Sequence, residues 1–204
     1  MSIAASTMMV EGMAREPSAG YPVDGTVTEE GALVARARDG DLDAFEAIMV
    51  LYEGRLLRFL TGLVGDVEIA RELCQDTFLA AYQAFPRLSG ELHLSAWLHT
   101  IAVNRARSHH RRRRLRQFLP FDEEHHTVSV TDAQESVVVN DTVRRVLDRM
   151  PPNYAQPLLL QTVSGLSCRE IAQVLGSTEG AIKVRLLRAR EAFRRLYAEE
   201  VGEL

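Results

Sequence analysis

The chain has 204 residues, is 46% hydrophobic and 25% charged, and carries a formal net charge of −4 at pH 7. This composition is typical of a globular protein and excludes a largely disordered one. No apolar run approaches the roughly 18 residues that span a bilayer, and the N-terminus lacks the basic flank and unbroken apolar core of a secretory signal. We therefore expect a cytoplasmic protein of one or two domains.

Helical periodicity begins at Thr28, after a tail (residues 1–27) that we predict to be disordered. Four helices are predicted in the next part of the chain, over residues 29–38, 42–63, 67–85 and 96–114. The chain breaks between them at Asp39-Gly40, at Gly65-Asp66 and at Pro86. A loop over residues 86–94 precedes the fourth helix, for which Ser95 is the expected N-cap. Cys74 and Cys168 fall inside predicted helices and match no zinc or disulfide spacing.

Residues 117–133 carry acids and no helical period, which predicts a flexible acidic linker. Helices resume over 134–149 and 154–163, and a helical hairpin follows. No segment alternates as a strand would. The sequence therefore predicts an all-α protein with two helical domains, a helical bundle and a helix-turn-helix domain, joined by the linker.

The charges are unevenly placed along the chain. Arginines and two histidines fill the segment from Arg105 to Arg116, which contains no acid, and a second basic block covers 183–195. The acids Asp122, Glu123, Glu124, Asp132, Glu135 and Asp141 lie between these two blocks. Because local patches rather than net charge set the affinity for phosphate, the pattern favours nucleic acid as a partner.

The hairpin lies within GLSCREIAQVLGSTEGAIKVRLLRAREAFRR, residues 165–195. Ser167 and Glu170 are spaced as a capping box, and Gly176 is expected to end the first helix in the left-handed conformation. Ser177 or Thr178 then caps the second helix. Its predicted buried stripe is Ile182, Leu186, Ala189 and Phe193.

The opposite side of the second helix presents small and basic residues: Gly180, Ala181, Lys183, Val184, Arg185, Leu187 and Arg188. A short helix, a glycine turn and a helix with such a face are typical of a DNA-binding helix-turn-helix. An ordinary amphipathic hairpin with a solvated basic face is the alternative.

Five phrases in this order resemble an extracytoplasmic-function sigma factor, the compact branch of the bacterial sigma-70 family. Three are similar to sigma domain 2: ARARDGDLDAFEAIMVLYEGRLLRFLTGLVGD, ARELCQDTFLAAYQAFPRL and SAWLHTIAVNRARSHHRRRR. Two are similar to domain 4: VLDRMPP and GLSCREIAQVLGSTEGAIKVRLLRAREAF. The resemblance covers about residues 30–198 and assigns 28–116 to domain 2 and 134–204 to domain 4.

Two positions depart from the family's pattern. Met150-Pro151 replaces the usual Leu-Pro, and Pro157 stands where a residue compatible with a helix is usual. Because proline removes an amide donor and clashes with the preceding turn, the domain 4 helix is expected either to begin late or to be kinked.

The resemblance implies a transcription initiation factor rather than an enzyme. Its implied partners are core RNA polymerase, through the β and β′ subunits, promoter DNA and an anti-sigma factor; it implies no cofactor, metal or small-molecule substrate. The third helix matches the segment that docks on the polymerase clamp helices. Its polar strip comprises Glu68, Arg71, Glu72, Gln75 and Asp76. From the residues alone, a solvated helix face is the stronger interpretation of this strip.

The loop and the fourth helix match the part that captures an unpaired base of the minus-ten element, for which the candidates are Leu88, Ser89, Gly90, His93 and Ser95. Asn104 is the candidate for a base edge beside the single-stranded region. The candidates for phosphate are Arg105, Arg107, His109, Arg111 and Arg112. A solvated or lipid-attracted charge run is the alternative, and Trp97 is expected in the core.

The second hairpin helix matches the reader of the minus-thirty-five element, with Thr178 at its start. Lys183, Val184, Leu187 and Arg188 occupy the family's base-reading positions, and Arg188 is the candidate for a bidentate guanine contact. Arg185 and Arg190 are expected to touch phosphate or an acid of their own domain. The linker corresponds to a segment in the polymerase's active-site cleft, with a plain spacer as the competing view.

Two other functions compete with this one. A DNA-binding regulator that never joins polymerase shares the helix-turn-helix but has no use for the clamp-docking helix or the base-capture loop. A metal enzyme would need His93, His99, His109, His110, His125 and His126 to act as ligands, and no pair of them shows ligand spacing with an acid or cysteine partner.

Overall fold

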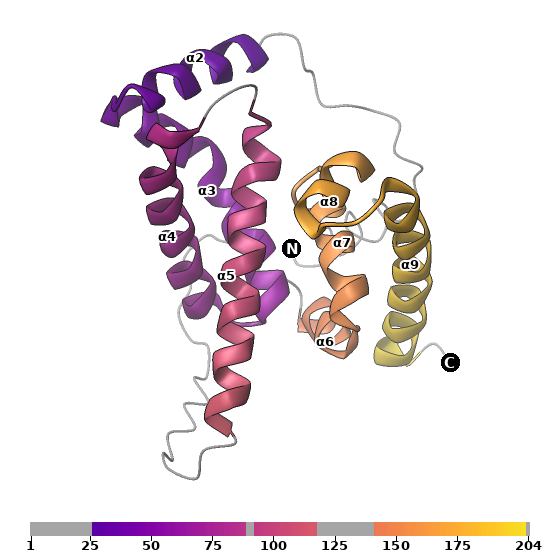
Figure 1. Cartoon of the computed structure of the whole chain (residues 1–204). Helices are drawn as coiled ribbons and strands as arrows, with labels where there is room; N and C mark the ends of the chain where they lie inside the picture. The colour runs from indigo at the N-terminus through magenta and orange to yellow at the C-terminus, as the bar shows by residue number, and fades with distance from the viewer. Residues whose placement is uncertain (1–25, 89–91, 118–140, 203–204) are drawn as a thin grey trace.

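The computed structural model describes residues 26–88, 92–117 and 141–202, and in these ranges it contains helices and no strand. Figure 1 shows two groups of helices side by side. The first group comprises α2 (Thr26–Arg38), α3 (Leu42–Val64), α4 (Val67–Ala84), the short 3₁₀ helix η1 (Phe85–Arg87) and α5 (Leu94–Gln117). The second comprises α6 (Asp141–Arg149), α7 (Pro152–Thr162), α8 (Cys168–Leu175) and α9 (Glu179–Val201). The prediction of an all-α protein with two helical domains is confirmed.

Residues 1–25 of the predicted tail lie outside the described residues, but its last two residues, Thr26 and Val27, are helical, because α2 begins at Thr26 and not at the predicted start, residue 29. All of the linker except Gln117, the last residue of α5, also lies outside the described residues, as does the start of the helix predicted over 134–149. Among the residues that the structure describes, no helix combines the length and the apolar character that crossing a membrane requires.

Side-chain caps and a glycine define the ends of α3 and α4. The carboxylate of Asp41 accepts from the backbone N–H of Ala44 at 3.1 Å at the start of α3. Gly65 ends α3 with φ of 74°, in the left-handed region where a side chain would be strained. Asp66 then caps α4 by accepting from the backbone N–H groups of Glu68 and Ile69.

The core of the first domain lies between α3, α4 and α5. Its largest fully buried side chains include Ile48, Phe59, Leu60, Phe85 and Leu98. Helix α2 is tied to this core by the Tyr52 hydroxyl, which donates to Glu30 Oε2 at 2.6 Å. Burial and this carboxylate raise the pKa of Tyr52 well above its usual value, so the hydroxyl keeps its proton and remains the donor.

The prediction that Ser95 caps α5 is wrong. The helix begins at Leu94, and the backbone N–H of Trp97 donates to the carbonyl of His93 at 3.0 Å. Leu94 is 1% exposed, and its burial in the core starts the helix two residues earlier than the cap pattern indicates. Ser95 lies in the first turn instead, where its carbonyl accepts from His99 Nδ1 at 2.8 Å.

The hairpin of the second domain forms as its sequence predicts. Ser167 and Glu170 make the capping box, and Gly176 ends α8 with φ of 62°. Of the two candidate caps for α9, Thr178 is the one used, since its hydroxyl accepts from the backbone N–H of Ala181 at 3.2 Å. The predicted stripe of Ile182, Leu186, Ala189 and Phe193 is buried.

Helix α7 runs through Pro157, which is buried in its interior. The helix begins at Pro152, so the expectation of a late start after Pro157 is wrong. The carbonyl that loses its donor is that of Asn153, four residues earlier, and Asn153 is exposed in the first turn where water can satisfy it. Pro152 fits the first turn of α7, because a backbone N–H at that position would have no partner within the helix.

Candidate nucleic-acid interface

The outer face of α9 presents the residues predicted to read bases. Lys183, Val184, Leu187 and Arg188 are exposed, whereas Arg185 is half-buried. Val184 is 50% exposed and Leu187 is 58% exposed, although a solvated helix face usually carries polar residues at such positions. Two apolar side chains between two cations match a major-groove surface, where thymine methyls and guanine acceptors lie side by side.

One ion pair on this face was missed by the sequence analysis. Lys183 Nζ lies 2.7 Å from Glu179 Oε1, one helical turn earlier, and both side chains are exposed. Their hydrogen bond and mutual attraction raise the pKa of Lys183 and lower that of Glu179. The spacing of four residues between Glu179 and Lys183 could have predicted this ion pair from the sequence. Any anion that binds Lys183 therefore has to compete with the Glu179 carboxylate.

Arg190 faces the protein rather than solvent. Its Nη2 donates to Gln161 Oε1 of α7 at 2.9 Å, so the partner within its own domain is an amide and not the expected acid. Helix α9 is also held at its far end, where Arg149 Nη2 of α6 lies 2.6 Å from Glu199 Oε2. These contacts fix the direction in which the outer face of α9 points.

The basic surface of α5 lies on the side away from the first-domain core. Asn104, Arg105 and Arg107 are exposed, as are Arg111 and Arg112. His109 is half-buried, and its pKa is lowered by burial and by the charges of His110 and Arg113. His109 is therefore neutral at pH 7 and offers hydrogen bonds rather than a positive charge.

Arg107 has a partner that the sequence did not suggest. Its Nη2 donates to Gln156 Oε1 of α7 at 3.2 Å, which links α5 to the second domain. The partner is 49 residues away in the chain, so no local pattern signals the contact. Arg107 is thus shared between the predicted phosphate surface and an interdomain contact.

The residues predicted to capture an unpaired base are only partly described. Ser89 and Gly90 lie outside the described residues. Leu88 is half-buried and packs against the core, His93 is exposed and Ser95 is half-buried. Trp97 is half-buried, and its ring meets that of Phe85 edge to face at 5.4 Å between centroids. The aromatic contact supports the expectation that Trp97 belongs to the core.

The polar strip predicted on α4 is exposed along its length: Glu68, Arg71, Glu72, Gln75 and Asp76. Arg71 Nη1 pairs with Glu68 Oε1 at 2.6 Å. Gln75 and Arg71 also line an apolar groove between α3 and α4, which the sequence analysis did not foresee.

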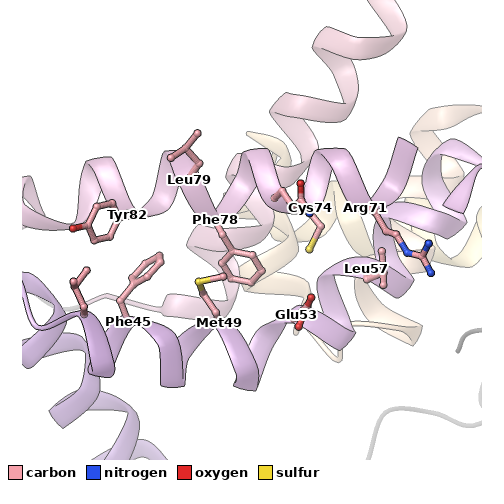
Figure 2. A pocket seen from close by; sticks show the side chains of 11 residues that line it. Phe45, Met49, Glu53, Leu57, Arg71, Cys74, Phe78, Leu79 and Tyr82 are labelled. Atoms are coloured by element: carbon pink, nitrogen blue, oxygen red, sulfur yellow. The ribbon is translucent and has the colours of Figure 1, made fainter. Parts of the chain in front are cut away.

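Figure 2 shows Phe45, Met49 and Phe78 in the space between α3 and α4, with Leu79 and Tyr82 on the α4 side. Leu79 is 57% exposed and Tyr82 is 43% exposed, so the groove has an apolar rim as well as an apolar floor. Cys74 lines the floor, and burial raises the pKa of its thiol to about 12, which keeps it uncharged. The spacing Gln75, Leu79, Tyr82 along one helix face was the signal for this surface.

Nowhere in the described ranges do three His, Cys, Asp or Glu side chains gather closely enough to hold a metal ion. The two described cysteines are free thiols.

Two family models match the chain. The model for sigma-70 region 2 matches residues 48–116, and the model for sigma-70 region 4 matches residues 140–193. The sigma factor SigF of Caulobacter vibrioides is 33% identical over 171 residues, which cover 82% of this chain and 93% of that protein. The sigma factor CarQ of Myxococcus xanthus is 30% identical over 168 residues, which cover 80% of this chain and 95% of that protein.

Solved structures of similar fold also contain both domains. The sigma factor RpoE of Bartonella quintana, in complex with the anti-sigma factor NepR, has a TM-score of 0.63 and 26% identity, covering 76% of this chain and 97% of that one. CnrH, in complex with the cytosolic domain of CnrY, has a TM-score of 0.64 and 23% identity, covering 81% of this chain and 94% of that one.

Proposed function

The chain belongs to the extracytoplasmic-function group of the sigma-70 family, and from this premise we propose which of its surfaces perform each step of initiation. It is an alternative sigma factor that directs promoter-specific transcription. Its proposed partners are core RNA polymerase and promoter DNA, and its activity belongs in the bacterial cytoplasm where both are found. Sigma factors are initiation factors, so the role we propose involves no catalytic residue, cofactor or substrate of its own.

One observation carries the assignment beyond a general DNA-binding protein. The same chain has an exposed recognition face on α9 and an apolar groove between α3 and α4, beside the polar strip of α4. A regulator that binds DNA alone needs the first surface and has no use for the second. An exposed apolar groove bordered by polar residues is typical of a protein-docking site. We assign it to polymerase.

In this assignment the second domain, α6–α9, reads the minus-thirty-five element. Arg188 donates to a guanine through both guanidinium branches, while Val184 and Leu187 contact thymine methyls. Lys183 and Arg185 hold the edge of the site, and Thr178 fixes the helix start. The hydrogen bond from Arg190 to Gln161 supports this role, because it sets how α9 is presented to the groove.

The first domain, α2–α5, reads the minus-ten element. Asn104 lies on the exposed face of α5 and faces the junction between duplex and single strand. Arg105, Arg107, Arg111 and Arg112 hold phosphates, and His109 adds a hydrogen bond. Leu88, Ser89, Gly90, His93 and Ser95 form the base-capture site at the start of α5, and the acidic linker occupies the polymerase cleft.

The groove between α3 and α4 docks on polymerase through Arg71, Gln75, Leu79 and Tyr82, with Glu68, Glu72 and Asp76 at its polar edge. RpoE is in complex with the anti-sigma factor NepR, and CnrH is in complex with the cytosolic domain of CnrY. We propose that this chain also binds an anti-sigma factor and that this binding silences it.

Reconstitution tests the proposal. The purified chain is mixed with core polymerase that lacks any sigma factor, and a genomic promoter library is transcribed and its start sites are mapped. We expect the two proteins to co-elute and the transcripts to begin at one shared class of promoter. A chain that binds promoter fragments but neither co-elutes with core polymerase nor supports transcription is a DNA-binding regulator instead.

A further inference from the structure

Helix α9 carries a carboxylate next to the side chains assigned to base reading. Glu179 is exposed in the first turn of the helix, and its Oε1 lies 2.7 Å from Lys183 Nζ. A carboxylate on a surface that approaches DNA repels the phosphates and so weakens binding to every sequence. The proposed function gives Glu179 no task, so its place beside Lys183 needs a separate explanation.

Glu179 keeps its negative charge at pH 7. The hydrogen bond from Lys183 and the positive charge of that side chain lower the pKa of Glu179, and the charge of Arg169, in the first turn of α8, acts in the same direction. An ionised carboxylate accepts hydrogen bonds and donates none. Glu179 therefore makes a favourable contact with DNA only where the DNA offers a donor.

The ion pair determines where this carboxylate lies when α9 meets DNA. The side chains of Glu179 and Lys183 are 47% and 64% exposed, so a ligand has access to both. Wherever Lys183 Nζ contacts a base, Glu179 Oε1 is one hydrogen-bond length away. A phosphate bound at Lys183 would lie beside a like charge, so the pair favours a base edge over a phosphate at this point.

The pair presents a donor and an acceptor side by side, and one base pair has the complementary pattern. In the major groove a G·C pair presents guanine N7 and O6, both acceptors, next to the amino donor at cytosine N4. Guanine O6 and cytosine N4 are hydrogen-bonded to each other, at about 2.9 Å. The 2.7 Å between Nζ and Oε1 matches this spacing. The ammonium group can therefore donate to guanine while the carboxylate accepts from cytosine.

The other base pairs fit this donor and acceptor less well. A reversed pair, C·G, places the carboxylate against the two guanine acceptors and the ammonium group against the cytosine amino group, and both contacts are repulsive. A T·A pair has thymine O4 beside the adenine N6 amino group. It offers the ammonium group only one acceptor, however, and adenine N7 then lies beside the carboxylate.

We propose that Glu179 determines specificity: together with Lys183 it reads one G·C pair of the minus-thirty-five element, with Lys183 on guanine and Glu179 on cytosine. The inference rests on the proposed function, because it requires α9 to lie in the major groove. Specificity then comes from rejection as well as from attraction, since an unmatched negative charge lowers the affinity for every other base pair at this position.

The test measures binding of the full chain by fluorescence anisotropy, on duplexes that carry every single base-pair exchange across the minus-thirty-five element. Lys183→Ala identifies the base pair that Lys183 reads, as the position at which a preference disappears. Glu179→Gln removes the negative charge and keeps the size of the side chain. Glu191→Gln is the matched control, because it removes the same charge from an exposed position of α9 about 18 Å further along the helix.

At that base pair we expect the wild type and Glu191→Gln to bind the G·C duplex about tenfold more tightly than the C·G duplex. For Glu179→Gln we expect a preference of about threefold or less, with tighter binding to the C·G duplex than the wild type shows. A uniform change on every duplex overturns the proposal. A carboxylate that only stabilises the start of α9 has this uniform effect, because it does not distinguish one base pair from another.

A second variant exchanges the two members of the pair. Glu179→Lys combined with Lys183→Glu keeps the net charge and exchanges the positions of donor and acceptor. We expect its preference at the same position to change from G·C to C·G. A preference that stays with G·C overturns the proposal. Circular dichroism checks that both exposed substitutions leave the helices intact.

The base pair assigned to Arg188 separates failure of this inference from failure of the proposed function. If every preference of the wild type survives in Glu179→Gln, including the one that depends on Arg188, this inference alone is wrong. If the wild type has no base preference at any position, α9 does not read DNA, and the proposed function fails together with the inference.

Discussion

Arg190 Nη2 of α9 donates to Gln161 Oε1 of α7 at 2.9 Å, which fixes α9 against the rest of its domain. Arg188, two residues earlier on the same helix, is exposed. Two arginines within one turn therefore have different tasks: one holds the helix in place, and the other faces outward. Substituting each arginine in turn separates the positioning of α9 from the proposed reading of DNA bases.

Replacement of Arg188 by alanine should weaken binding only at promoters that carry the preferred base. A bidentate contact to guanine discriminates by about 1–3 kcal/mol, and this difference should disappear from the variant. Binding is measured by anisotropy on a set of minus-thirty-five duplexes that differ at single positions. A uniform loss on every duplex would show that Arg188 holds phosphate.

Replacement of Arg190 by alanine should lower the stability of the fold and leave sequence preference unchanged. A net hydrogen bond contributes about 0.5–1.5 kcal/mol, and the Arg190 side chain is half-buried against α7. Urea denaturation followed by circular dichroism gives the loss, and the duplex set used for Arg188 gives the preference. A changed preference with unchanged stability would reverse the two assignments.

Replacement of both Gln75 and Asp76 by Arg, which makes the α4 strip more positive, should abolish binding to core polymerase and leave the fold intact. Both side chains are exposed on α4 beside the apolar groove, so they are replaced without disturbing the core. Co-elution with core polymerase measures binding, and circular dichroism checks the helices. Asp39→Arg, on the exposed turn between α2 and α3, controls for the effect of adding positive charge elsewhere on the domain. Retained affinity would show that the α4 strip is only a solvated surface.

Removal of the Ser167 hydroxyl should destabilise the helix-turn-helix by about 1 kcal/mol, since Ser167→Ala deletes the cap of α8. The hydroxyl accepts from the backbone N–H of Glu170 at 3.3 Å, and the Glu170 side chain returns to the backbone of Ser167 at 2.8 Å. Thermal unfolding measures the loss, and Ser167→Thr, which keeps a capping hydroxyl, serves as the control. Equal melting of both variants would mean that the cap contributes little.

Stability should fall as the pH drops below 6.5, in part because of His99. Burial lowers the pKa of His99 below its ordinary value of 6.5, and Nδ1 donates to the Ser95 carbonyl. The unfolded chain therefore takes up a proton at a higher pH than the folded chain does. The stability that the neutral ring confers is complete above pH 6.5 and is lost between that value and the lower folded pKa.

The measurement is urea denaturation at a series of pH values from 7.5 to about 5. His99→Phe, which keeps a ring against Phe59, should show a shallower dependence on pH than the wild type. His109 also has a lowered pKa and contributes a slope of the same sign to both proteins. Parallel curves for the two proteins would contradict the role assigned to His99.

Local patterns predicted the second domain well. The capping box at Ser167, the left-handed Gly176 and the stripe from Ile182 to Phe193 depend on residues within one or two turns, and each is found in the structure. The start of α5 was placed wrongly because burial of Leu94 outweighs the preference of Ser95 for a cap position. Tertiary packing decided that boundary.

The features that the sequence did not reveal are contacts between distant segments. The hydrogen bond from Arg107 to Gln156 and the close approach of Leu159 to Gly62 join residues far apart in the chain, so no periodicity in the sequence signals them. The groove between α3 and α4 was missed for another reason. Leu79 and Tyr82 extend the apolar side of α4 beyond the stripe that the core covers, and only the position of α3 shows where that stripe ends.

The apolar rim formed by Leu79 and Tyr82 has a consequence for the protein in bulk. A surface of this kind lowers solubility when nothing covers it, and copies of the chain then adhere to one another. Each copy made beyond the supply of polymerase or of a silencing partner would be drawn into aggregates or degraded. We therefore expect the usable amount of this factor in a cell to be limited by its partners, however strongly its gene is expressed.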